Sequence, residues 1–88
     1  MRVKFEFYDN TIDNIQFIFF EFESTLKVRD MINMFLNKNK SEKKIKTMMF
    51  LYEGKNLNCS KFLDKNIKDI FNSYFTNIVK VYEPNFIA

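Results

Sequence analysis

The middle of the chain decides the fold, where it reads Leu51-Tyr52-Glu53-Gly54-Lys55-Asn56-Leu57 and then Phe62-Leu63-Asp64-Lys65-Asn66-Ile67. Hydrophobic and aromatic residues lead up to Gly54, the only glycine, which permits the positive φ of a tight turn. Leu57 returns a hydrophobic residue soon after that turn. The stretch therefore predicts a strand, a hairpin, a short return strand and then a helical turn, 61–64, that Ser60 caps.

Two strands are predicted before this stretch. In residues 1–8 hydrophobic residues alternate with charged ones, which indicates a strand with one buried face. After a turn rich in Asp and Asn, a second strand is predicted over 15–23. Its phase has two solutions. Either the even-numbered residues 18–22 face the core and leave Phe17 and Phe19 outside, or a bulge switches the faces midway.

One long helix, about 26–38, is predicted between the second and third strands, with Ser24-Thr25 as its cap. Its hydrophobic residues recur at helical spacing and form one stripe, which comprises Val28, Met31, Ile32, Phe35 and Leu36. The remaining strands are predicted over 47–52 and 76–83, with a second short turn near 68–71 between them.

This order of elements resembles that of the ubiquitin-like, or β-grasp, family. The opening strand 1–5, the helix seam of Val28, Met31 and Phe35, and the corner 62–67 are similar to the corresponding parts of ubiquitin. The resemblance implies an α+β fold in which a mixed sheet of four to five strands packs on one main helix. At 88 residues, we expect 1–88 to form a single ubiquitin-like domain.

Composition points away from catalysis. The chain has no histidine, and its one cysteine, Cys59, lies in a predicted turn with no base near it in sequence. We therefore expect no enzyme activity, no catalytic residues, no cofactor and no metal site. A single cysteine also favours a reducing, intracellular compartment, in first place the cytoplasm or nucleus, with an organelle or cytoskeletal assembly as the other options. No apolar run approaches the roughly 18 residues that span a bilayer, so no membrane insertion is expected.

The end of the sequence departs from the ubiquitin pattern. The resemblance implies that a conjugated modifier would end in Gly-Gly, whereas this sequence ends Glu83-Pro84-Asn85-Phe86-Ile87-Ala88. We therefore expect a non-conjugating member.

A binding surface is predicted on the outer face of the sheet, where the resemblance implies that ubiquitin-like proteins meet their partners. Leu51, Lys80, Tyr82 and Lys55 match ubiquitin positions on or beside that face, and strand alternation adds two more. The candidate interaction residues are thus Met49, Leu51, Lys55, Ile78, Lys80 and Tyr82. The competing interpretation is that the insertion 72–75 or the tail segment 85–87 folds back and covers this face.

The predicted function is that of a non-catalytic interaction module, or a small structural subunit, that docks a protein partner through the outer sheet face. The partner can be part of a larger multi-subunit assembly. If Phe17 and Phe19 face outward they form a second candidate surface, and two apolar faces indicate a chain held in an assembly or dimer.

Three alternatives remain open. One is a ubiquitin-like modifier with an unusual or truncated C-terminus, and another is a PB1-like pairing domain in which Lys4 meets an acidic loop. The third is nucleic-acid binding through segment 37–46, which has five lysines and one glutamate. No aromatic residue is interleaved with those lysines to stack a base, which makes a nucleic-acid partner the less favoured alternative.

Overall fold

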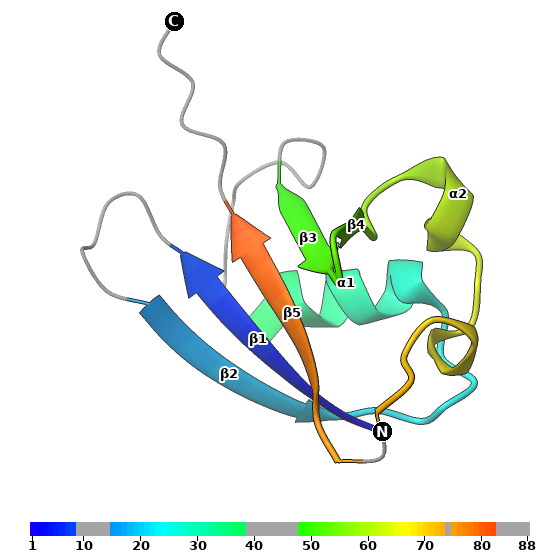
Figure 1. The fold of residues 1–88 in the computed structure, drawn as a ribbon, viewed down its shortest axis with the longest axis horizontal. Helices are drawn as coiled ribbons and strands as arrows, with labels where there is room; N and C mark the ends of the chain where they lie inside the picture. The colour runs from blue at the N-terminus through cyan, green and yellow to red at the C-terminus, as the bar shows by residue number, and fades with distance from the viewer. Residues whose placement is uncertain (9–14, 39–47, 74, 83–88) are drawn as a thin grey trace, which may run out of the picture.

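The computed structural model describes residues 1–8, 15–38, 48–73 and 75–82, whose course is drawn in Figure 1. The described elements, in chain order, are β1 (Arg2–Tyr8), β2 (Ile15–Glu21), α1 (Val28–Lys38), β3 (Met49–Tyr52), β4 (Lys55–Asn56), α2 (Ser60–Leu63), the 3-10 helix η2 (Ile67–Asp69) and β5 (Asn77–Tyr82). The predicted order of strands and helices is confirmed in these residues.

The strands form one mixed sheet in the order β2-β1-β5-β3-β4, and α1 crosses one face of it (Figure 1). The two central strands, β1 and β5, run parallel, while β2 pairs antiparallel with β1 and β3 pairs antiparallel with β5. Parallel neighbours need a crossover connection, which here passes through α1 and the β3-β4 hairpin. This topology brings the first and last strands of the described chain side by side.

The helix stripe and the inward face of the sheet form the core. Phe35 is fully buried at the centre of an aromatic cluster, with its ring centroid 4.6 Å from that of Phe5, 5.6 Å from Phe50 and 5.9 Å from Phe7. The other stripe residues are also buried, apart from the half-buried Leu36. Burying side chains of this size stabilises by roughly 1.5–3 kcal/mol each, so this cluster is a main source of stability.

The first solution for the phase of β2 is correct. Its register with β1 runs unbroken from Arg2 opposite Glu21 to Tyr8 opposite Ile15, so no bulge interrupts the pair. Phe22, just beyond β2, is buried, whereas Phe17 and Phe19 are 54% and 56% exposed. The strand ends at Glu21 rather than at residue 23, and the Phe22 amide instead donates a hydrogen bond to the Met1 carbonyl at 2.8 Å.

Both predicted caps are wrong. Helix α1 begins at Val28, and the Ser24-Thr25 pair lies in a turn before it, where the Ser24 carbonyl accepts a hydrogen bond from the Lys68 amide at 3.1 Å. Ser60 is the first residue of α2, so the capping position belongs to Cys59, whose side chain makes no capping hydrogen bond. Before α1, backbone hydrogen bonds with the segment 65–68 fix the turn in place of a side-chain cap, whereas at α2 the Cys59 carbonyl accepts hydrogen bonds from the Phe62 and Leu63 amides of the same turn.

The approach to β5 is held by a small polar network. The Tyr52 hydroxyl lies 2.8 Å from Asn72 Oδ1 and 3.0 Å from the Oδ1 of the buried Asn77, and it accepts a hydrogen bond from the Asn72 amide at 3.2 Å. The Ser73 amide also donates to Asn77 Oδ1 at 3.0 Å. Since a buried polar group without a partner is costly, these bonds fix where β5 starts and therefore where Ile78 lies.

Candidate protein-interaction surface

The alternation predicted for β3 and β5 is confirmed. Phe50, Val79 and Val81 face the helix with no exposed surface. Their neighbours point to the opposite, outer face of the sheet: Met49 and Ile78 are 40% and 43% exposed. On the same face, Leu51 and Tyr82 are half-buried and Lys80 is exposed. Because side chains alternate across a strand, burial of one set requires the other set to face outward.

Register brings these outward residues together. Leu51 lies opposite Lys80, and Met49 lies opposite Tyr82. On the other side of β5, β1 places Glu6 opposite Lys80 and Tyr8 opposite Tyr82. Paired residues of neighbouring strands point to the same face, so β1 contributes to this surface as directly as β3 does.

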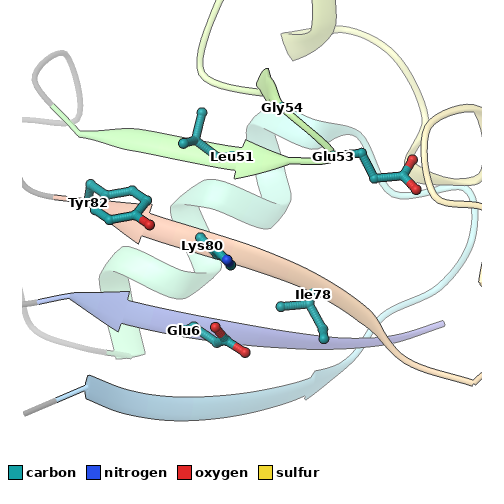
Figure 2. Close-up of a pocket in the computed structure, with 7 residues that line it drawn as sticks. All are labelled: Glu6, Leu51, Glu53, Gly54, Ile78, Lys80 and Tyr82. Atoms are coloured by element: carbon teal, nitrogen blue, oxygen red, sulfur yellow. The ribbon is translucent and has the colours of Figure 1, made fainter.

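A shallow hollow of about 600 Å³ lies on this face (Figure 2). We call it the outer-face hollow, and it is lined by Glu6, Leu51, Glu53, Gly54, Ile78, Lys80 and Tyr82. Figure 2 shows Lys80 in the middle strand, with Leu51 on the strand at one side of it and Glu6 on the strand at the other. The hollow thus combines apolar walls with charges of both signs, as sites that bind a partly polar surface do.

Three of these lining residues, Glu6, Glu53 and Gly54, were not among those predicted from sequence. Glu6 falls at an outward position of β1, which its alternation with buried residues indicates. The local sequence around Glu6 does not indicate that β1 is the neighbour of β5. The two strands lie far apart in the sequence and meet only through their parallel pairing in the sheet.

Lys55 lies apart from the other five predicted residues. It is exposed on β4 and does not line the outer-face hollow. In register it pairs with Tyr52, whose side chain is buried on the core side, and not with Leu51. The tight turn at Glu53 and Gly54, both with positive φ, sets this pairing.

Charges on the outer face are unequally paired. Lys4 Nζ lies 3.4 Å from Glu6 Oε2, and the Tyr8 hydroxyl donates to Glu6 Oε1 at 3.3 Å. Burial, together with the adjacent Glu6 carboxylate, raises the pKa of Tyr8. Among the described residues, no carboxylate forms an ion pair with Lys80. Lys80 is therefore a cation of this face that no described carboxylate neutralises.

The described part of the insertion 72–75 does not cover this surface. Asn72 and Ser73 are held by Tyr52 and Asn77, and the Phe75 side chain is 87% exposed. The tail segment 85–87 and most of the lysine-rich segment 37–46 lie outside the described residues. The described chain contains no group of three or more His, Cys, Asp or Glu side chains placed to hold a metal ion. Nor is any of its described helices long and apolar enough to cross a membrane.

No protein-family model matches the chain, and no curated protein sequence matches it. Among solved structures, it is similar to a ubiquitin-like protein from the hyperthermophilic archaea Caldiarchaeum subterraneum, with a TM-score of 0.58 and 10% sequence identity. The match covers 98% of this chain and 99% of that chain. The predicted α+β fold, a five-stranded mixed sheet on one main helix of ubiquitin-like β-grasp type, is therefore confirmed. At this identity the likeness establishes the fold alone.

Proposed function

We propose, from this ubiquitin-like fold, that the chain is a non-catalytic, non-conjugating interaction module or small structural subunit that docks a protein partner through its outer sheet face. The observation that supports this most is the outer-face hollow, in which the apolar side chains of Leu51, Ile78 and Tyr82 lie around Lys80, a cation that pairs with no described carboxylate. Neighbouring apolar side chains that stay partly exposed in a small protein are typical of an interface.

The lining of the hollow indicates the chemistry of the partner. Leu51 and Tyr82 are the proposed anchors, because each is already half-buried and loses little side-chain freedom when covered. Lys80 favours a carboxylate on the partner beside its apolar contact, and Glu6 and Glu53 disfavour a second one nearby. We therefore infer a partner surface with an apolar centre and a single acidic group.

The same lining supports binding rather than turnover. Among the residues that the structure describes, no cysteine, serine, threonine or histidine lines the hollow, and Glu6 is already engaged by Lys4 and Tyr8. Nucleophilic catalysis needs a nucleophile and a base within hydrogen-bond reach of each other. Burial and charge complementarity are what these residues offer.

The alternative that uses Lys4, a PB1-like pairing, is less well supported. Lys4 lies beside Glu6 and also over the Phe17 ring, 4.5 Å from its centroid. A partner's acidic loop would have to compete with that internal carboxylate. Lys80 has no such competitor among the described residues.

Affinity capture from the source cell tests the proposal. The bait is wild type, a Leu51→Asp/Ile78→Asp variant, or Met34→Asp, a matched control because Met34 is 44% exposed on α1 rather than on the sheet. Circular dichroism first establishes that each variant is folded. We expect wild type and Met34→Asp to retain one stoichiometric partner that the double variant loses. Retention of every partner by the folded double variant would contradict this use of the outer face.

A further inference from the structure

Strand β2 forms one edge of the described sheet, and nothing in its own sequence protects that edge. In the order β2-β1-β5-β3-β4, no described strand lies beyond it. Its seven residues read IQFIFFE, with no lysine, arginine or proline, and its pairing with β1 has no bulge. Natural edge strands usually carry such features, since a bare edge pairs with other chains.

On the outer face of the sheet, the side chains of β2 are strongly apolar. Ile15, Phe17 and Phe19 are 45%, 54% and 56% exposed, and they alternate along one face of the strand. The single charge of β2 is Glu21 at its end, whose Oε2 lies 3.3 Å from the N-terminal ammonium group. A strand with this pattern is stabilised by another strand laid alongside it that covers the exposed aromatic rings.

We propose that this strand is β2 of a second copy, so that two chains join edge to edge into one continuous sheet around a two-fold axis at Ile18. The inference is separate from the proposed docking surface, because it uses the free edge of β2, whereas the outer-face hollow lies over β1, β5 and β3, and because it names a different partner.

The register follows from the length and parity of the strand. In an antiparallel pair, the numbers of any two opposite residues add up to the same value. The outward side chains of β2 belong to odd-numbered residues, so they lie opposite each other only if that value is even. Pairing Ile15 with Glu21 of the other copy is the only register that uses all seven residues, and it satisfies this condition. It places Ile18 opposite its own copy, so the arrangement is self-complementary, as a two-fold interface requires.

This register also gives the aromatic side chains their partners. Phe17 lies opposite Phe19 of the other copy, and Phe19 lies opposite Phe17 of the other copy. These two adjacent pairs place four phenylalanine rings around the two-fold axis. Directly opposite cross-strand aromatic pairs contribute roughly 0.2–1 kcal/mol each. A register centred on Phe19 would instead set Phe17 against Glu21 and would shorten the pairing.

The size of the contact predicts a weak dimer. A buried phenylalanine covers roughly 150–250 Å², and about half of each ring at Phe17 and Phe19 is still available. With Ile15 and the strand edge, the dimer buries less than the roughly 1,200 Å² of a standard specific interface. Association should therefore depend on protein concentration.

Sedimentation equilibrium across a wide concentration range tests the dimer. We expect the mass of the wild-type protein to rise from 10.7 kDa towards twice that value as concentration increases. A Phe17→Lys/Phe19→Lys variant, which sets lysines opposite lysines, should stay at the monomer mass, while Met34→Lys should behave as wild type. A wild type that remains monomeric at its highest soluble concentration would overturn the proposal, as would a folded double variant that dimerises like wild type.

Disulfide trapping tests the register independently. In a Cys59→Ser background, a Phe17→Cys protein is mixed with a Phe19→Cys protein in a glutathione redox buffer. Opposite residues have Cβ atoms roughly 4.5–5.5 Å apart, whereas diagonal ones are roughly 7–8 Å apart. We expect the mixed 17–19 disulfide to accumulate several-fold over the 17–17 and 19–19 products. Equal yields of all three would overturn the proposed pairing.

Discussion

Tyr8 and Tyr82 stack face to face across the parallel strands β1 and β5, with ring centroids 4.6 Å apart and ring planes 7° apart. The stack ties the first described strand to the last on the outer face. It also holds in place the Tyr82 ring, which lines the outer-face hollow. Tyr82 is thus both a proposed anchor and a structural residue.

The stack predicts that Tyr82→Ala is destabilising. Loss of the aromatic pair should lower the free energy of unfolding by roughly 0.5–1.5 kcal/mol, in addition to the loss that comes from burying less apolar area. Tyr82→Phe keeps both rings and should remain close to wild type in stability. Urea unfolding followed by circular dichroism measures both changes in the free energy of unfolding. Equal stability of the alanine and phenylalanine variants would show that the stack contributes nothing. For the same reason, Leu51 and Ile78 are cleaner positions than Tyr82 for testing docking.

Tyr8 should ionise at a higher pH than an ordinary tyrosine. Burial and the negative charge of Glu6 raise its pKa, since both disfavour the phenolate. Because the pKa of Tyr8 is higher in the folded than in the unfolded state, protonated Tyr8 contributes to the free energy of unfolding. That contribution is fully present below the ordinary pKa near 10 and is lost as pH rises through the pKa of the folded state.

The ionisation of Tyr8 can be isolated by titrating the ultraviolet absorbance of wild type and of Tyr8→Phe and subtracting the second curve from the first. In a Glu6→Gln background, the same difference should titrate at lower pH, because the carboxylate no longer opposes ionisation. An unchanged Tyr8 titration in that background would rule out the contribution of Glu6.

The polar network at the start of β5 predicts that Tyr52→Phe is costly although the ring remains. Removing the hydroxyl takes one hydrogen bond from the buried Asn77, whose Oδ1 keeps the one from the Ser73 amide, so the expected cost is that of a single hydrogen bond, roughly 0.5–1.5 kcal/mol. A double-mutant cycle with Asn77→Ala should give a loss smaller than the sum of the two single losses, because each change removes the same contact. Strict additivity of the free energies of unfolding would contradict a direct interaction.

Two neighbouring residues of α1 provide a matched test of the core. Phe35 is fully buried within its aromatic cluster, and Met34 beside it is 44% exposed. Phe35→Ala should cost roughly 3–5 kcal/mol, whereas Met34→Ala should stay within about 0.5 kcal/mol of wild type. Chemical denaturation of both variants checks the difference. Similar losses at the two positions would mean that the helix is oriented differently against the sheet.

Much of this architecture was predictable from local patterns. The alternation in β1 and β5 and the helical stripe from Val28 to Phe35 each identify a buried face, because a single periodicity decides which side chains leave water. The turn at Gly54 was predicted from its conformational freedom, and its φ is +78°. Glu53 also adopts a positive φ, +48°, which its residue type does not indicate.

What local patterns left undecided depends on contacts between distant segments. In β2 both faces carry aromatic residues, so only pairing with β1 and the position of α1 decide that Phe17 and Phe19 face outward. The predicted Ser24-Thr25 cap failed because hydrogen bonds from the connection before β5 hold the start of α1. Glu6 joins the outer-face hollow only through the parallel pairing of strands from the two halves of the chain.

Two exposed lysines differ in their relation to the outer-face hollow. Lys80 lines the hollow and has no ion-pair partner among the described residues, while Lys55 lies beyond β3 and pairs in register with the core-facing Tyr52. If the captured partner places its acidic group over the hollow, Lys80→Glu should weaken binding by more than Lys55→Glu.

The expected size of this effect is that of an exposed ion pair. Such pairs contribute roughly 0.2–1 kcal/mol, so Lys80→Glu should weaken binding by a factor of up to about five, plus any repulsion. The loss should shrink as salt concentration rises, because salt screens exposed charges. Titration of each variant with the partner at two ionic strengths measures both quantities. An effect of Lys55→Glu equal to that of Lys80→Glu would move the acidic contact away from the hollow and towards the β3-β4 hairpin.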